Sequence, residues 1–289
     1  MLSKFENKKI VIITNSKGAE LTSMRLKGDD TEYIWQADAN YWGRHAPVLF
    51  PIVGRLKDNR YIYGGNTYKL NQHGFARDKD FDIMDKSDTS ILYVLKSNAE
   101  TKEVYPFDFE LKIKYEICEN RVMIRYYVLN TGLEDMYFSI GAHPGFNCPL
   151  HADEKLEDCY IEFDNPETIN TSIFKEGTIL DMRPAFKNTS VISLSKDLFK
   201  NDAMIIQGMK SKSISIKSKK SKSCVSVECG GFPYLGIWSN ANGGNFVCIE
   251  PWYGITDSFA STGKLEEKKG IQKISKGQTF KCGYSIEIE

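Results

Sequence analysis

The sequence lacks a long apolar segment and has no excess of charge of either sign. The N-terminal stretch MLSKFENKKIVIITN carries charges within its first ten residues and contains only a four-residue apolar run. Such a run is too short for a signal peptide or a membrane span, which predicts a cytoplasmic protein with no membrane partner. The 38 basic side chains balance the 38 acidic ones, so no overall field attracts nucleic acid or anionic lipid.

Familiar motifs of metal, cofactor and hydrolase sites are also missing. The seven cysteines are odd in number and include no CxxC pair, so we expect reduced thiols. Cys224 and Cys229 could approach a metal, but no second pair of ligands accompanies them, and we expect no metal site. The chain has no GxGxxG after a strand and no GxxxxGK[ST], HExxH or GxSxG. The sequence therefore predicts neither a bound cofactor nor a Ser-His-Asp hydrolase.

Helical periodicity is scarce, and strand-like alternation is common. Apolar residues occupy every second position across residues 109–117, 122–128 and 280–288, as in strands with one face toward water. The best candidate for a helical turn spans residues 195–203, with Ser195 as its cap. This pattern predicts an all-β fold, a large antiparallel sandwich or barrel. Because no linker-like segment divides the chain, we expect one domain over residues 1–289.

A lysine-rich segment at residues 210–222 could suggest a nucleic-acid surface. However, Ile214 and Ile216 alternate there with serines and lysines, which predicts an exposed hairpin whose lysines protect a sheet edge. The segment also lacks the interleaved aromatic residues that stack on bases. We therefore expect no nucleic-acid partner.

Three segments place polar residues among glycines, prolines and aromatic residues. They are residues 71–77 (NQHGFAR) with 50–55 (FPIVGR) before them, 139–146 (SIGAHPGF) and 248–257 (CIEPWYGITD). Each alone could be structural, because a His-Gly pair can belong to a turn and a Glu-Pro pair can end a strand. Taken together, they make His73, His143 and Glu250 candidates for one cleft, since such backbone brings side chains into clefts.

These candidates support proton transfer on a small neutral substrate. Two imidazoles and one carboxylate can remove a proton on one side of the substrate and deliver one on the other. Glu250 lies beside Trp252 in an apolar run, so we expect its pKa to be raised by partial desolvation. Trp238, Phe75 and Trp252 could pack against the apolar face of a sugar ring.

The motifs HGFAR, GAHPGF and IEPW, in this order and at these separations, resemble those of the aldose 1-epimerases (galactose mutarotase-like proteins), specifically their LacX-type branch. The resemblance continues from EYIWQADANYW (residues 32–42) through PIVGRLKDNRYIYGG, NDAMII and YLGIWS to the closing strand. It implies a β-supersandwich that acts on a sugar without metal or cofactor. It carries no signal about the oligomeric state.

The same resemblance assigns expected roles to single residues. Glu250 matches the base that takes the proton from the anomeric hydroxyl. His143 matches the acid that protonates the ring oxygen, and His73 matches the second histidine, which hydrogen-bonds the substrate. Asp202, Arg55 and Arg77 match residues that bind the sugar. With the two tryptophans named above, Trp238 and Trp252, they make up the expected binding residues.

Two departures from the family pattern concern the substrate. Gly54-Arg55 stands where typical galactose mutarotases have Asn-Arg, and Trp252 stands where they have glutamine, which argues against galactose as the preferred sugar. The HGFAR segment is shared with hexose-6-phosphate mutarotases, and Arg77 could bind a phosphate. The balanced charge of the chain and the nearby Asp78 and Asp80 favour a neutral sugar.

The sequence therefore predicts an aldose 1-epimerase that interconverts the α and β anomers of a hexose by acid–base ring opening. Three alternatives remain. The first is an inactive carbohydrate-binding or regulatory module on the same fold. The others are a hexose-6-phosphate mutarotase and a different sugar-processing enzyme, such as a lyase, because a fold does not fix a function.

Overall fold

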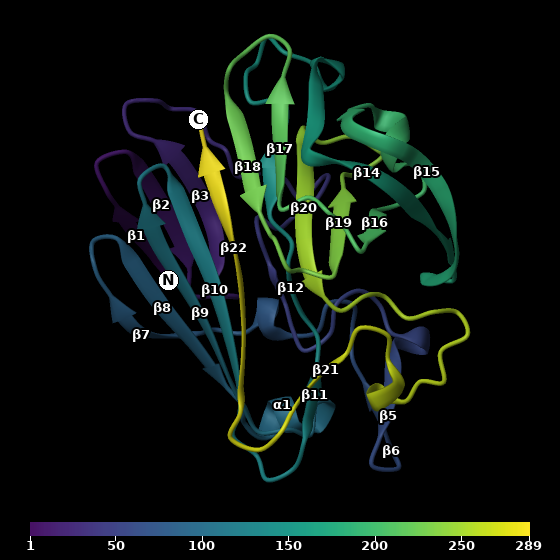
Figure 1. The fold of residues 1–289 in the computed structure, drawn as a ribbon. Helices are drawn as coiled ribbons and strands as arrows, with labels where there is room; N and C mark the ends of the chain where they lie inside the picture. Colours follow the sequence, from purple (N-terminus) through teal and green to yellow (C-terminus); the bar gives the residue numbers. More distant parts are fainter.

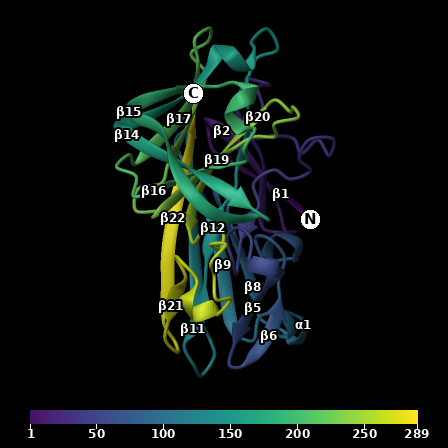
Figure 2. The same cartoon turned by 90° about the vertical axis from the view of Figure 1, so that its right-hand side faces the viewer.

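A nine-stranded antiparallel sheet forms one side of the computed structural model, which describes residues 1–289 (Figure 1). In spatial order its strands are β15 (Thr178–Ser193), β14 (Cys159–Lys175), β17 (Ser213–Ser218), β18 (Cys224–Glu228), β22 (Thr279–Ile288), β10 (Arg121–Asn130), β9 (Phe109–Cys118), β8 (Ser90–Lys96) and β7 (Asp82–Lys86). The long β14–β15 hairpin curves away from the rest of this sheet (Figure 2).

A six-stranded sheet lies behind it and carries the segments of interest. Its strands are, in order, β16 (Met204–Gln207), β19 (Tyr234–Trp238), β20 (Phe246–Tyr253), β12 (Ile140–Ala142) and β4 (Val48–Leu49), with β13 (Gly145–Asn147) also paired to β20. Three smaller sheets complete the strands: β1 (Leu2–Glu6), β2 (Ile10–Asn15) and β3 (Glu20–Leu26); β11 (Met136–Phe138) with β21 (Gln272–Ile274); and β5 (Arg60–Tyr63) with β6 (Asn66–Lys69).

Helical structure is limited to short segments. They are α1 (Ala99–Val104) and the 3₁₀ turns η1 (Lys57–Asn59), η2 (Ala76–Asp78), η3 (Leu156–Asp158), η4 (Lys196–Phe199) and η5 (Leu265–Glu267). The turn expected at residues 195–203 is present as η4, but it is shorter and Ser195 makes no side-chain cap. Helix α1 was not predicted; Asn98 caps it by accepting a hydrogen bond from the backbone N–H of Thr101. None of these helices is long and apolar enough to cross a membrane.

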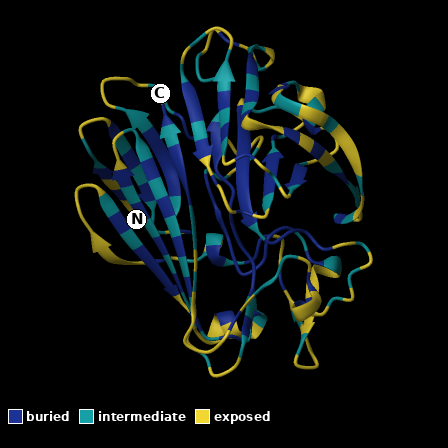
Figure 3. Cartoon of the chain, viewed as in Figure 1, coloured by how far each residue is buried: buried dark blue, intermediate teal, exposed yellow.

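The predicted strand alternation is confirmed where it was strongest. Residues 109–117 and 122–128 lie in β9 and β10, whose side chains alternate between buried and partly exposed (Figure 3). The two strands form a hairpin in which Tyr126 faces Ile113 and Ile124 faces Tyr115. The lysine-rich segment forms the expected hairpin as well. Its strands β17 and β18 lie between β14 and β22 inside the sheet, however, so the expectation that its lysines protect an edge is wrong.

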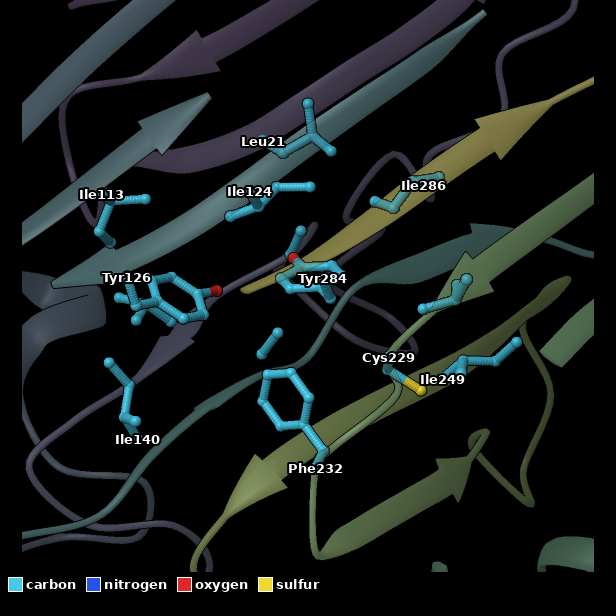
Figure 4. Close-up of a cluster of buried hydrophobic side chains, with 14 of the residues drawn as sticks. Leu21, Ile113, Ile124, Tyr126, Ile140, Cys229, Phe232, Ile249, Tyr284 and Ile286 are labelled. Carbon is cyan, nitrogen blue, oxygen red and sulfur yellow. The ribbon is translucent and has the colours of Figure 1, made fainter. Parts of the chain in front are cut away.

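The main core fills the space between the two large sheets. Figure 4 shows Ile113, Ile124 and Ile286 from β9, β10 and β22 near Ile140 and Ile249 from β12 and β20, all within one buried cluster. Since successive side chains of a strand point to opposite faces, this arrangement leaves the other face of β20 free to carry different chemistry.

Candidate active site

One cavity of about 360 Å³ gathers the residues that the sequence analysis singled out. Eight of its lining residues are the ones predicted to act on or bind a sugar: Arg55, His73, Arg77, His143, Asp202, Trp238, Glu250 and Trp252. The curved β14–β15 hairpin contributes Phe174 and the turn residue Gly177 to the wall. The structure therefore brings together three segments that lie far apart in the chain.

Strand β20 places Glu250 at the cavity by its alternation. Val247 and Ile249 point into the main core, so Cys248 and Glu250 point to the opposite face. The strand pairs with β19 on one side and with β12 and β13 on the other. Glu250 is thus a buried carboxylate on a central strand with little freedom to move.

Two glycines make room for the indole of Trp252. A Cβ at Gly236 on β19 would lie 2.5 Å from the Trp252 ring, and one at Gly141 on β12 would lie 2.6 Å from Cδ1 of the ring. Glycine is the residue that allows such close approach between strands. The indole N–H donates to the carbonyl of Ala142 at 3.2 Å, which fixes the ring beside the cavity.

His143 is held between aromatic rings and meets Glu250. Its imidazole stacks on Trp42 with ring centroids 4.7 Å apart, and the edge of Trp238 approaches at 5.7 Å. Its Nε2 lies 3.1 Å from Oε2 of Glu250. The sequence analysis missed Trp42, although it is one of only four tryptophans in the chain, three of which line the cavity.

The backbone of Gly54 fixes the ring of His73. The N–H of Gly54 donates to Nδ1 of His73 at 3.1 Å, and the N–H of His73 donates back to the carbonyl of Gly54 at 2.8 Å. Because Nδ1 accepts a hydrogen bond, the ring proton sits on Nε2. Gly54 has a φ of 71°, and a Cβ there would overlap Oγ1 of Thr256. Burial lowers the pKa of His73 well below 6.5, so the ring is neutral, and its Nε2 also lies 3.2 Å from the side-chain amide nitrogen of Gln72.

Burial shifts the pKa values of Glu250 and His143 in opposite directions. It raises the pKa of Glu250 well above the ordinary carboxyl value, and the negative charge of Asp202 acts in the same direction. It lowers the pKa of His143 from 6.5 to about 3. Both shifts favour the uncharged forms, a protonated carboxyl group and a neutral imidazole. The rise in the pKa of Glu250 that the sequence predicted is present.

Two arginines in the wall lack close carboxylate partners. Arg55 forms no ion pair, and its Nη2 lies 3.4 Å from Oε1 of Gln72. Arg77 donates to the backbone carbonyl of Gln72 at 2.7 Å, and its one carboxylate contact is at 4.0 Å from Asp78. Burial and the neighbouring Arg44 lower the pKa of Arg77 to about 10, which leaves it charged at neutral pH.

Asp202 and Phe75 differ in their relation to the cavity. Asp202 follows η4 with a φ of 71°, remains exposed and lines the cavity, where its carboxylate is available to hydroxyl groups. Phe75 does not line the cavity. It packs instead on the main core, with its ring 6.3 Å from that of Phe50, so the expectation that it contacts a sugar is wrong.

A second, larger hollow of about 670 Å³ is lined mainly by residues of β10 and β22. Its charged side chains are largely paired, since Arg121 contacts Glu228 and Glu287, and Arg125 contacts Glu116. It contains no histidine and no buried carboxylate. The smaller cavity is therefore the candidate active site.

Comparisons with known proteins agree with this architecture. A family-wide sequence profile described as aldose 1-epimerase matches residues 1–266. The chain is 34% identical over 298 aligned residues to a Lactococcus lactis protein named LacX, covering all of this chain and 99% of that protein. The chain therefore belongs to the aldose 1-epimerase family, as the motifs indicated.

Solved structures show the same fold. A galactose mutarotase related enzyme from Lactobacillus acidophilus superposes with a TM-score of 0.96 and 40% identity, covering 100% of this chain and 97% of that one. A galactose mutarotase-like protein from Lactobacillus casei gives a TM-score of 0.92 and 30% identity over the full length of both chains. The expected β-supersandwich of the galactose mutarotase-like proteins is thus confirmed.

Proposed function

We propose that the protein is a mutarotase that interconverts the α and β anomers of a hexose. The observation that carries this proposal is the 3.1 Å contact between His143 Nε2 and Glu250 Oε2. The pair lies in the wall of a cavity large enough for a small ligand. Ring opening needs one group that accepts a proton and one that donates a proton, and a site that only binds sugar needs neither.

Glu250 and His143 transfer protons in one direction when the sugar ring opens and in the reverse direction when it closes. Glu250 takes the proton of the anomeric hydroxyl, the bond between C1 and the ring oxygen breaks, and His143 gives its proton to the ring oxygen. The product is the open-chain aldehyde. After rotation about the C1–C2 bond, the ring oxygen attacks the other face of C1, and both protons return. His73 donates from Nε2 to a substrate oxygen and steadies the aldehyde.

This cycle requires the proton to start on His143, whereas burial in the free protein favours a protonated Glu250 and a neutral His143. The two arrangements have the same net charge, so transfer across the 3.1 Å contact buries no additional net charge. A bound hydroxyl that donates to the carboxylate favours its ionised form. Substrate binding therefore prepares the base and the acid in the same step.

Polarimetry on freshly dissolved α-glucose and α-galactose tests the proposal. The wild-type protein should accelerate mutarotation well above the spontaneous rate. Glu250→Gln and His143→Asn should each lower the rate by ~10²-fold or more, because each removes proton transfer. His73→Asn should cost less, and Glu228→Gln, at an exposed position on β18, should cost nothing. Binding of hexoses without acceleration would favour the inactive carbohydrate-binding module.

A hexose phosphate is a second candidate substrate, and one observation favours it. Arg55 has no ion-pair partner and Arg77 only a distant one, whereas phosphate recognition needs convergent cationic groups that are free to bind it. The exposed Asp202 and the neutral chain favour an uncharged sugar. Comparing kcat/KM for hexoses and their 6-phosphates decides between them. A tenfold preference for the phosphate that is lost in Arg55→Ala and Arg77→Ala would select the phosphate, and the mutarotase proposal would stand.

A further inference from the structure

Three side chains with metal-ligating atoms converge beside the cavity. Cys248 and Glu250 are two residues apart on β20 and point to the same face. His143 reaches them from the neighbouring segment between β12 and β13, where Gly145 pairs with Cys248. The imidazole nitrogen, the thiol sulfur and a carboxylate oxygen all lie within 4.8 Å of one another.

All three side chains are buried, and the oxygen that faces the histidine has no donor. Exposed fractions are 0% for Cys248, 1% for Glu250 and 8% for His143. Oε2 of Glu250 is buried without a hydrogen-bond partner, although Nε2 of His143 lies 3.1 Å away. Leaving such an atom unsatisfied costs free energy. A bound cation would satisfy it.

We propose that His143, Cys248 and Glu250 form a binding site for a thiophilic divalent cation of the Zn²⁺ type. A cation bound there occupies the lone pairs of His143 and Glu250 that proton transfer requires. The protein therefore cannot catalyse the reaction while the metal is bound. Only this consequence for turnover rests on the proposed function. The donor set of one nitrogen, one sulfur and one oxygen suits Zn²⁺, Co²⁺ or Cd²⁺, whereas Mg²⁺ and Ca²⁺ prefer oxygen ligands.

Charge and geometry both fit such an ion. On binding, the thiol and the carboxyl group each release a proton to solvent, so Zn²⁺ with a thiolate, a carboxylate and a neutral imidazole has no net charge. This neutrality suits a buried site.

Tetrahedral Zn²⁺ holds its ligands roughly 3.3–3.8 Å apart. The nitrogen and the oxygen, at 3.1 Å, are close to this spacing. The sulfur needs to move by at most about 1 Å from its present limit of 4.8 Å.

The cavity leaves room for entry and for a fourth ligand. His143 and Glu250 line the cavity, whereas Cys248 lies outside the lining, among Trp35 and Phe246. An ion that enters from solvent therefore meets the imidazole and the carboxylate first and the sulfur last. Its remaining coordination position faces the cavity, where water completes the coordination. Catalytic zinc sites likewise use three protein ligands and one open position.

Cobalt titration tests the site without any activity assay. The protein is used in a Cys118→Ser background, which removes the one exposed thiol. We expect Co²⁺ to bind with a stoichiometry near one and to give a sulfur-to-cobalt charge-transfer band with visible d–d bands. Zn²⁺ should displace Co²⁺, and a large excess of Mg²⁺ should not. Cys248→Ala should abolish the charge-transfer band and weaken Zn²⁺ binding at least tenfold, whereas Cys229→Ala, at another buried thiol, should change neither.

His143→Asn provides a second variant if Cys248→Ala folds poorly, and it too should weaken Zn²⁺ binding at least tenfold. Absence of the charge-transfer band in the wild-type protein, or unchanged Zn²⁺ affinity in a folded variant of either residue, would overturn the site. Failure of the proposed function is a separate result. In that case polarimetry detects no acceleration while the cobalt bands remain. If the mutarotase proposal and the metal-site proposal are both correct, Zn²⁺ inhibits turnover in the wild-type protein and not in Cys248→Ala.

Discussion

Glu250→Gln should make the protein more stable at neutral pH while it removes activity. Burial raises the folded-state pKa of Glu250 well above its ordinary value of 4.5. Above pH 4.5 the folded protein therefore keeps a proton that the unfolded chain releases, and folding becomes less favourable as pH rises. Glutamine has no proton to keep. Its side-chain N–H can also donate to Nε2 of His143, which now lies 3.1 Å from an unpartnered oxygen.

The size of this stability difference follows from the linkage between proton binding and folding. The difference in unfolding free energy between Glu250→Gln and wild type should be small near pH 4.5 and grow by about 1.4 kcal/mol per pH unit above it. The growth continues until the pH reaches the folded-state pKa of Glu250, and each 1 kcal/mol corresponds to a rise in Tm of roughly 2 °C for a chain of this size. His143 titrates in both proteins, so its contribution largely cancels in the difference.

Differential scanning calorimetry from pH 4.5 to 6.5, together with polarimetry, checks this prediction. Glu228→Gln is the matched control, because that side chain is exposed on β18 and should show no such slope. A stability difference that does not change with pH would mean that Glu250 is ionised in the folded protein. Glu250 and His143 would then not share a proton in the folded protein, even if the variant were inactive.

Three further predictions concern the surroundings of the pair. Because burial lowers the pKa of His143 to about 3, kcat/KM should stay within about twofold between pH 7 and pH 5; an acid limb at 6.5 would contradict the burial. Gly54→Ala should lower Tm more than Gly64→Ala, since both positions have positive φ but only the first Cβ meets neighbouring atoms, and equal losses in calorimetry would refute this. Lys268→Ala should cost about 3–5 kcal/mol in urea unfolding, because it leaves a buried carboxylate unpaired. Lys264→Ala, which breaks an exposed pair, should leave the urea midpoint nearly unchanged.

The strands that the sequence predicts best are those with one face toward water. Residues 109–117 alternate because β9 has a buried face and a partly exposed one, and this pattern is local. The curved β14–β15 hairpin has no comparable signal, since its register shifts several times along the pair. The interior place of the lysine-rich hairpin was also unpredictable, because pairing with β14 and β22 joins segments far apart in the chain.

In the candidate site, too, local motifs predict single residues, whereas contacts between distant segments are not predicted. Motifs place His143 and Glu250 in unusual local contexts, which was enough to select them. Their contact depends on the pairing of β12 and β13 with β20, which local patterns do not encode. Trp42 was missed because it follows a turn outside any strand and gains its meaning only by stacking on His143. The single-domain organisation over residues 1–289 stays a prediction.

The position of the pair on central strands also explains how the site can keep an unfavourable arrangement. A buried carboxyl without a partner and a neutral imidazole both destabilise the fold relative to apolar residues. They persist because Glu250 lies on a strand paired on both sides, and because Trp252 is held against Gly141 and Gly236 without space to shift. Because strand pairing places the two side chains 3.1 Å apart, they are positioned for proton transfer, and the free energy lost in stability preorganises the site.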